Sequence, residues 1–300
     1  MSLLVVGSVA IDSVKTPFGE RKEVLGGSAT FFSISASAFT KVMLVGVVGK
    51  DFPKKYIRTL QNKGVDLKGL EVGQGKTFRW KGKYEYDLNT AHTIYTKLNV
   101  FQNFSPRIPA EYKKAEYLFL ANIDPRLQLL VLKNMKRPRL VACDTMNFWI
   151  TSSPQALKKV LKEVDIFILN DSEIRLFAQE SNLITAARYV FTLGPKIVII
   201  KRGDSGALLL TKNGGCFSAP AYLMDSVKDP TGAGDSFAGG FMGYVSSRND
   251  LSESGFRKAV IYGTIMASFC VQDFGPNRLL SLKSKDIAER LANYKKHVQF

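Results

Sequence analysis

Short apolar runs recur along the chain, and they limit it to one class of fold. They lie at residues 3–6, 42–48, 117–121, 140–142, 166–169, 197–200 and 207–210. Uninterrupted runs of this kind are typical of strands that are buried on both faces of a parallel sheet. Helical patterns at 154–164, 171–180 and 182–191 separate several of them. The sequence therefore predicts an α/β fold, with a mostly parallel central sheet and helices on both faces.

One region departs from this pattern, because polar and aromatic residues alternate at 77–87 and again at 91–100. Period-two alternation indicates strands with two different faces, and residues 87–90 suit a turn between them. We therefore expect a hairpin that projects from the main body. It is either an edge hairpin of the main sheet or, as its aromatic residues favour, a flap over a ligand. The last third of the chain is helical, with amphipathic segments at 256–269 and 286–294.

The formal net charge of +16 raises the question of an anionic partner such as nucleic acid. The 42 lysine and arginine residues are scattered in short clusters, and they form no long basic stripe or aromatic-interleaved RNA motif. We therefore expect a lysine-rich, solvated surface and no nucleic-acid partner. The positive field also suits an anionic nucleotide as a co-substrate.

Cysteine usage and hydropathy argue against several other classes of protein. The three cysteines, Cys143, Cys216 and Cys270, stand too far apart for a disulfide framework or a Cys-x-x-Cys metal site. No apolar stretch reaches the roughly 18 residues of a membrane span, and the N-terminus lacks the pattern of a secretory signal. We therefore expect a cytoplasmic protein without a membrane partner.

The run Asp229-Pro230-Thr231-Gly232-Ala233-Gly234-Asp235 carries the clearest chemical signal. Its glycines allow the backbone to approach a ligand closely, and the residues that follow can begin a helix. Backbone amides at a helix start, together with the helix dipole, can hold the negative charge of a phosphoryl group in transit. Asp235 is then placed to take a proton from an attacking hydroxyl. On spacing alone, a glycine-rich helix start capped by an aspartate explains the run equally well.

This run resembles the Asp-x-x-Gly-Ala-Gly-Asp signature of the ribokinase-like family, also called the phosphofructokinase B (PfkB) family of carbohydrate and nucleoside kinases. Four further motifs agree with the family in order along essentially the whole chain. They are Gly7-Ser8 with Asp12, Gly26-Gly27, Asn170 with Glu173, and the segment from Lys201 to Gly206, in which Lys201 stands where the family has Thr. The resemblance implies one ribokinase-like α/β domain over residues 1–300. A small β-strand lid would be formed by about residues 12–25 and 70–102.

The resemblance further implies an ATP-dependent kinase that transfers the γ-phosphoryl group to a hydroxymethyl group of a sugar. Asp235 would be the catalytic base, and the amides of Gly232, Ala233 and Gly234 would form the anion hole. One alternative is an adenosine-like nucleoside kinase of the same fold. Another is a non-catalytic protein that binds a nucleotide or sugar, although such a protein has no need of the base that Asp235 provides.

Binding roles also follow from the resemblance. Asp12, Gly26 and Gly27 would hold substrate hydroxyls, while Asn170 and Glu173 would order Mg²⁺, largely through water. The other residues of the ATP site would be Lys201, Gly203, Thr231, Phe274 and Gly275, with the adenine between the Gly203 turn and the helix at 256–269. Some relatives require a monovalent cation such as K⁺, and its site here would lie near Asp225 and Val227. A homodimer is left open.

One departure from the family limits the choice of substrate. Ribokinase-type members carry an Asn a few positions after the two glycines, and this Asn binds sugar hydroxyls. Here Phe31 and Phe32 follow instead. These aromatic residues either face the core or form an apolar wall for a base, so the sequence leaves both a sugar and a nucleoside open.

Overall fold

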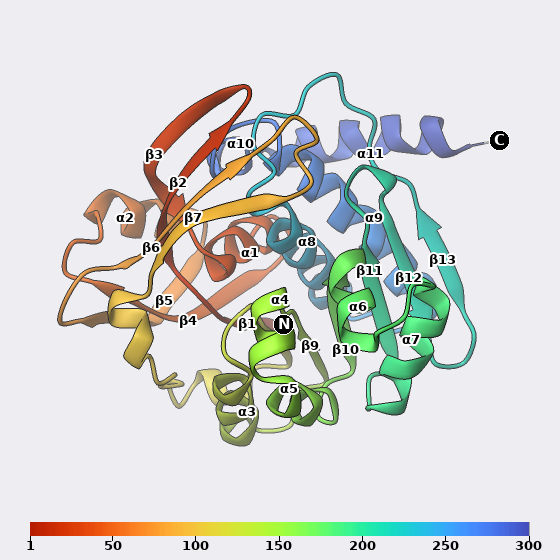
Figure 1. The fold of residues 1–300 in the computed structure, drawn as a ribbon, viewed down its shortest axis with the longest axis horizontal. Coiled ribbons are helices and arrows are strands. Elements are labelled where there is room, and N and C mark those ends of the chain that lie inside the picture. The colour runs from red at the N-terminus through yellow and green to blue at the C-terminus, as the bar shows by residue number, and fades with distance from the viewer. Residues whose placement is uncertain (300) are drawn as a thin grey trace.

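The main element of the computed structural model is a large sheet with helices on both faces (Figure 1). The structure describes residues 1–299, so Phe300, the last residue of the expected domain, lies outside it. The nine strands of the large sheet lie in the order β13-β12-β11-β10-β9-β8-β1-β4-β5. Pairs from β11 to β5 are parallel, and only β12 and β13 are antiparallel to their neighbours. The strands are β1 (Ser2–Val6), β4 (Lys41–Gly49), β5 (Val65–Gly73), β8 (Tyr117–Leu120), β9 (Leu140–Cys143), β10 (Ile166–Asn170), β11 (Ile197–Lys201), β12 (Ala207–Thr211) and β13 (Cys216–Ala219).

The predicted mostly parallel α/β sheet is confirmed, and burial on both faces explains why its strands are apolar throughout. Leu3 and Val5 of β1 pack in one core, while Leu4 and Val6 of the same strand pack in the other. Helices α1 (Ser28–Ala36), α8 (Ala233–Arg248) and α9 (Glu253–Cys270) cover the first face. Helices α3 (Pro125–Asn134), α5 (Pro154–Leu161), α6 (Asp171–Ala178) and α7 (Leu183–Thr192) cover the second.

Helices α2 (Lys54–Asn62), α10 (Asn277–Leu280) and α11 (Ser284–Val298) lie toward the edges of these layers (Figure 1). The short helix α4 (Asn147–Ser152) lies beside α5 and α6 on the second face. The amphipathic segments predicted in the last third of the chain correspond to α9 and α11. Within residues 1–299, no helix combines the length and the apolar character that a membrane crossing requires.

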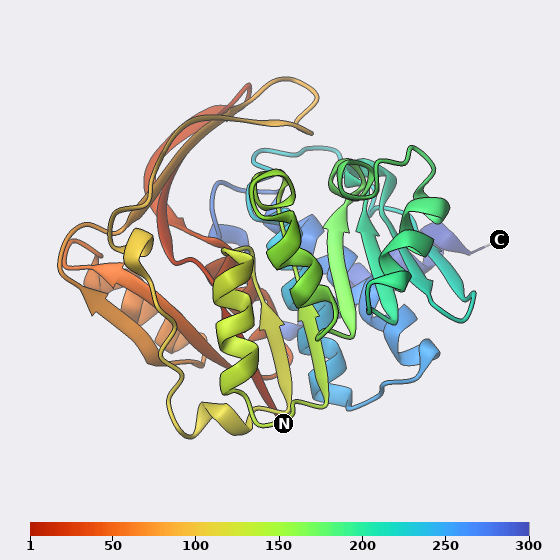
Figure 2. The same cartoon turned by 60° about the horizontal axis from the view of Figure 1, so that its bottom comes forward.

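A second sheet of four strands, in the order β3-β2-β6-β7, arches over the carboxyl ends of the parallel strands (Figure 2). Its strands are β2 (Ala10–Thr16), β3 (Gly19–Gly26), β6 (Phe78–Tyr84) and β7 (Ala91–Lys97), and we call it the lid sheet. The predicted hairpin is β6 and β7, which pair antiparallel, while β6 runs parallel to β2. The expected lid segment 70–102 begins too early, because residues 70–73 continue β5 and pair with β4 in the large sheet.

Candidate active site

The lid sheet places Asp12 against the two glycines that precede α1. The amide of Gly27 donates a hydrogen bond to Oδ2 of Asp12 at 3.3 Å. A Cβ at position 26 would lie 1.9 Å from the same oxygen, and Gly27 has a φ of 95°, so both positions require glycine. Burial, with repulsion from the carboxylates of Asp229 and Asp235, raises the pKa of Asp12 to about 7. The structure thus brings together the three residues expected to hold the substrate.

The run from Asp229 to Asp235 forms the turn that begins α8. Asp229 is buried, and its Oδ1 accepts a hydrogen bond from the amide of Thr231 at 2.9 Å. Gly232 has a φ of 77°, and a Cβ there would lie 2.4 Å from the ring of Phe31, so this turn also requires glycine. Asp235 lies in the first turn of the helix. The predicted helix start is therefore confirmed.

Two of the three amides expected to form the anion hole are free to meet a ligand. In the part of the chain that the structure describes, the amides of Gly232 and Gly234 donate no hydrogen bond. The amide of Ala233 instead donates to the carbonyl of Pro230 at 3.1 Å and closes the turn. Free amides at the start of a long helix, aided by the helix dipole, favour an anion.

A cluster of charged side chains lies next to these amides. Nζ of Lys201, at the end of β11, is 3.3 Å from Oδ2 of Asp144, and a Cβ on Gly234 would lie 3.0 Å from the same Nζ. Burial lowers the pKa of Lys201, but Asp144, Glu173 and Asp235 together raise it above its usual value. Lys201 therefore stays protonated at neutral pH and places a positive charge among these carboxylates.

The Asp235 carboxyl is half-buried, and its pKa is raised to about 7. The main cause is the loss of water around the charge; repulsion from Asp144 adds to it, and attraction to Lys201 opposes it. A carboxylate with a pKa close to neutral can both accept and release a proton at neutral pH. This direction of shift suits the expected role of Asp235 as a general base, which stays a prediction.

Asn170 and Glu173 form a capping box at the N-terminus of α6. Oδ1 of Asn170 accepts a hydrogen bond from the amide of Glu173 at 2.8 Å, and Oε2 of Glu173 accepts one from the amide of Asn170 at 2.7 Å. Burial raises the pKa of Glu173 to about 7, Lys201 opposes this shift, and Asp144 adds to it. The capping arrangement is therefore present, whatever else Glu173 binds.

The fit of a magnesium ion depends on what the capping box leaves free. Oε1 of Glu173 makes no hydrogen bond within residues 1–299. The same residues contain no group of three or more carboxylate, histidine or cysteine side chains that could hold a metal ion. Magnesium keeps several waters and commonly uses one or two carboxylates together with substrate phosphates. The residues therefore fit an ion that arrives with a polyphosphate, but not a permanently bound one.

The lid sheet reaches two of the residues expected to bind ATP. Oγ1 of Thr231 donates a hydrogen bond to the hydroxyl of Tyr84, at the end of β6, at 3.3 Å. A Cβ on Gly203 would lie 3.1 Å from Oδ1 of Asn89, in the loop between β6 and β7. Figure 2 shows this loop overhanging the large sheet. The lid sheet is therefore closed over the start of α8.

Phe274 and Gly275 lie next to β3 of the lid sheet. The amide of Gly275 donates to Oδ2 of Asp229 at 3.0 Å. Phe274 is buried, and the guanidinium of Arg21 in β3 lies 5.2 Å from its ring centroid. Phe274 thus lies against β3 of the lid sheet, and its expected role in binding ATP stays a prediction.

Asp225 and Val227 lie in the irregular segment between β13 and α8. The next residue, Lys228, donates its amide to the carbonyl of Val271 at 2.8 Å and accepts a hydrogen bond from the hydroxyl of Thr16 at 2.8 Å. The segment therefore connects the lid sheet with the end of α9, and its expected monovalent cation stays a prediction.

Phe31 and Phe32 are part of the core. Their side chains are 2% and 0% exposed, and the ring of Phe32 stacks on that of Phe119 with centroids 4.3 Å apart. The interpretation that they face the core is confirmed, so they do not form a wall for a base.

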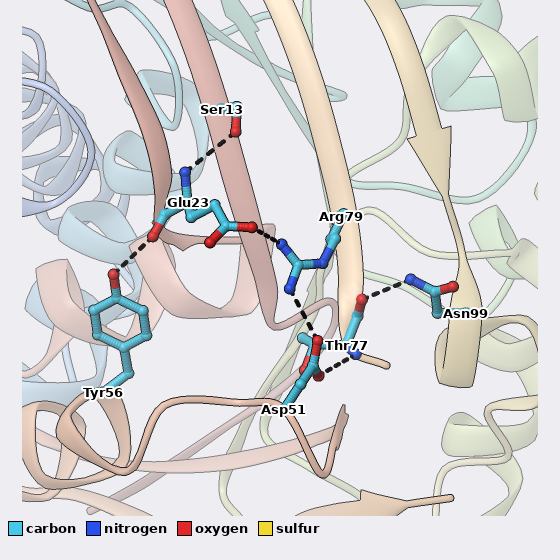
Figure 3. Close-up of polar contacts among 7 residues, drawn as sticks. All are labelled: Ser13, Glu23, Asp51, Tyr56, Thr77, Arg79 and Asn99. Atoms are coloured by element: carbon cyan, nitrogen blue, oxygen red, sulfur yellow. Dashed lines mark hydrogen bonds and ion pairs between the residues drawn. The ribbon is translucent and has the colours of Figure 1, made fainter. Parts of the chain in front are cut away.

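A polar network anchors the base of the lid sheet, as Figure 3 shows. Nη2 of Arg79 in β6 pairs with Oδ2 of Asp51 at 2.9 Å, and Nη1 of the same side chain pairs with Glu23 of β3. Oδ1 of Asp51 accepts two hydrogen bonds at 2.7 Å from the amide and hydroxyl of Thr77. Asn99 donates to the carbonyl of Thr77 at 2.8 Å. The chain is therefore fixed where it enters and leaves the hairpin.

Asp144 was not predicted to be part of the site. It follows directly after β9, as Asn170 ends β10, and polar residues at the carboxyl ends of parallel strands collect at one edge of a sheet. Its position directly after β9 was the feature of the sequence that could have identified Asp144. The Arg79 network gave no signal, because its members come from separate segments.

A mostly parallel sheet, a lid sheet over its carboxyl edge and a glycine-rich helix start with an aspartate define a ribokinase-like kinase. The sequence pattern of the family described as "pfkB family carbohydrate kinase" matches residues 2–282, and the chain belongs to this family. It is thus a carbohydrate or nucleoside kinase.

Individual relatives act on nucleosides and on sugars. A cytidine kinase of Thermococcus kodakarensis is 31% identical over 261 residues, which cover 84% of this chain and 91% of that protein. The nucleoside kinase of Methanocaldococcus jannaschii, an archaeal member of the ribokinase family, superposes with a TM-score of 0.77 at 21% identity, over 97% of this chain and 98% of that one. A Vibrio cholerae fructokinase with bound fructose, ADP and potassium gives a TM-score of 0.80 at 18% identity, over 97% and 98% of the two chains.

Proposed function

We propose that this protein is an ATP-dependent nucleoside kinase that transfers the γ-phosphoryl group to the hydroxymethyl group of the ribose. The observation that carries the proposal is the position of Asp235. Its carboxyl lies in the first turn of α8, next to the free amides of Gly232 and Gly234, and it is close enough to both Asp12 and Lys201 to influence their pKa values. A base between a hydroxyl-binding group and a phosphate-binding group is what direct phosphoryl transfer requires.

In the proposed reaction, Asp12 accepts hydrogen bonds from the ribose hydroxyls and holds the hydroxymethyl group toward Asp235. The Asp235 carboxylate takes the hydroxyl proton while the oxygen forms its bond to the γ-phosphorus. The bond from that phosphorus to the bridging oxygen breaks, and ADP leaves with the electron pair. The free amides of Gly232 and Gly234 stabilise the charge on the transferring group.

Lys201 and Glu173 act on the ATP side of the site. Lys201 provides a fixed positive charge next to Gly234 for the phosphates. Magnesium bound with those phosphates supplies the further positive charge that the transferring group needs. Oε1 of Glu173 is the oxygen available to hold it through water, and Asn170 fixes the orientation of that carboxylate. By analogy with the potassium-bound fructokinase, the segment with Asp225 and Val227 is the proposed place for K⁺.

The choice of a nucleoside rests on the relative with 31% identity, which is a cytidine kinase. Burial of Phe31 and Phe32 does not oppose it, because the base must then be held elsewhere. A free sugar is the second candidate, since the family description and the fructokinase point to carbohydrates. Both candidates share the hydroxymethyl group on which Asp235 would act.

The test is ADP release from ATP with cytidine, adenosine, inosine, ribose and fructose offered separately at equal concentrations. We expect turnover with nucleosides, led by cytidine, and ³¹P NMR should place the new phosphate on the hydroxymethyl oxygen. Turnover with free sugars alone would overturn the nucleoside assignment. Phosphorylation of none of the five acceptors would count against the proposed substrate class as a whole.

A further inference from the structure

We propose that Trp80 is the residue on which the base of the nucleoside stacks, and that its ring sets the preference for nucleosides over free sugars. This proposal rests on the proposed nucleoside kinase function and names the part of the site that recognises the base.

Trp80 lies on the face of the lid sheet that is turned toward the site. β2 and β6 pair in parallel with Asp12 opposite Trp80, and directly paired residues of a sheet point to the same face. Gly82 and Tyr84 follow at alternate positions and share this face. Since the hydroxyl of Tyr84 contacts Thr231 at 3.3 Å, the face looks onto the start of α8.

The indole lies over the strand because position 82 is a glycine. A Cβ there would lie 2.3 Å from Cζ2 and Cη2 of Trp80, so any larger residue would displace the ring. Nε1 of Trp80 donates a hydrogen bond to Oγ1 of Thr93 in β7 at 3.1 Å, which fixes its rotation. An irregularity in the register between Lys81 and Gly82 brings Thr93 opposite Gly82. One face of the indole therefore packs on β6 at Gly82. The opposite face points away from the strand, and the side chain is half-buried.

The two side chains match the two parts of a nucleoside: the Asp12 carboxylate can bind the ribose hydroxyls, and the fixed Trp80 ring can stack on the base. Neighbouring strands lie about 4.8 Å apart, so a ribose held by Asp12 leaves its base within reach of the ring on the next strand. Bases stack on aromatic side chains because each base has a flat π-face, whereas a free sugar has no such face to place there. Phe31 and Phe32 are buried in the core, so their rings cannot provide this stacking surface.

A direct test uses the fluorescence of Trp80. The chain contains two tryptophans, Trp80 and Trp149, so Trp149→Phe leaves Trp80 as the single emitter. We expect cytidine to quench this emission saturably, at concentrations that also saturate turnover, and ribose at the same concentrations to leave it unchanged. Emission that does not respond to saturating cytidine would overturn the proposal.

A kinetic test separates stacking from a purely structural role. Trp80→Leu should raise the KM for cytidine between about fivefold and 150-fold, the range that stacking on an aromatic side chain supplies, with the KM for ATP unchanged. Trp80→Phe keeps a ring and should recover most of the loss. Gly82→Ala should raise the KM for cytidine as well, because it displaces the indole without removing it. Melting temperatures of the three variants show whether each is folded.

The outcomes distinguish this proposal from the function on which it rests. If wild-type protein phosphorylates cytidine and Trp80→Leu leaves its KM unchanged, Trp80 does not bind the base, and the kinase assignment stands. If the wild-type protein phosphorylates sugars and no nucleoside, the nucleoside assignment itself is wrong. Should Trp80→Leu fail to fold, the fluorescence measurement and the Trp80→Phe and Gly82→Ala variants still decide.

Discussion

Replacing Asp235 with Asn should have two opposite effects, a loss of activity and a gain in stability. The activity loss follows from the proposed role, because an amide cannot accept the hydroxyl proton. Removing a general base typically lowers the rate by about 10² to 10⁴. The stability gain follows from the environment of Asp235, which is costly for a negative charge. Function and stability thus conflict at this residue, as is common in active sites.

The size of the gain can be worked out from the pKa shift. The pKa of Asp235 is raised from 3.8 to about 7, mainly by burial and then by Asp144. A difference of about three units at about 1.4 kcal/mol each sets an upper limit of about 4 kcal/mol for the ionised group. The carboxyl is half-buried and the amide is not equivalent to a protonated acid, so we expect roughly 1–3 kcal/mol.

The sign of the pH dependence is fixed by the direction of the shift. A carboxyl whose pKa is higher in the folded state binds its proton more tightly there, so its ionisation destabilises the fold as pH rises from about 4 to about 7. The advantage of Asp235→Asn over wild type should therefore be largest near pH 8 and should shrink toward pH 5. Wild-type kcat/KM should rise through about pH 7, as Asp235 loses its proton.

Urea unfolding without ATP, measured between about pH 5 and pH 8, tests the stability claim, and ADP release tests the activity claim. Glu163→Gln is the matched control, because the Glu163 side chain is exposed at the surface. An Asn variant that gains nothing at pH 8 relative to pH 5 would refute the electrostatic reasoning. A variant that keeps more than about half of the wild-type kcat would refute the assignment of the base.

Two further variants test the ATP side and the lid anchor. Glu173→Gln can keep the capping hydrogen bond but loses the charge, so we expect a higher magnesium requirement for half-maximal activity with little change in Tm; an unchanged requirement would leave Glu173 as a helix cap only. Arg79→Ala removes the ion pairs with Asp51 and Glu23, so the amides of β6 should exchange faster and the KM for the acceptor should rise, with Arg79→Lys intermediate. Unchanged exchange in β6 would contradict the anchoring role.

The strands of the large sheet could be predicted because both of their faces are buried, which leaves an uninterrupted apolar run in the sequence. β3 gives no such run, since most of Gly19–Gly26 is exposed, and only the family resemblance placed this segment in the lid. β5 was not predicted either, because Val65–Gly73 is an edge strand with intermediate burial and polar residues. Strands are therefore predictable where their sequence keeps a regular pattern, either an uninterrupted apolar run or, as in the hairpin β6–β7, a period-two alternation.

The motif residues of the site were predictable because each stands in a short run that resembles a motif of the family. Gly232 and Asp235 are set by a positive φ and a helix start, which are local properties, whereas Gly26 is required by the approach of Asp12 from β2. The position of Trp80 over Gly82 and its bond to Thr93 depend on the strand register and its irregularity. Alternating aromatic residues indicated a flap over a ligand, but not which ring faces the site.

Lys201 shows how a departure from the family pattern can have a physical cause elsewhere in the chain. Its partner Asp144 is 57 positions away, and the two side chains are 17% and 6% exposed. A buried carboxylate without a partner is strongly destabilising, so a threonine at position 201 would leave Asp144 uncompensated. Lys201 also lowers the pKa values of Glu173 and Asp235, which Asp144 raises. Asp144 and Lys201 therefore form a unit: the lysine that neutralises the first carboxylate also keeps Asp235 sufficiently ionised to act as a base near neutral pH.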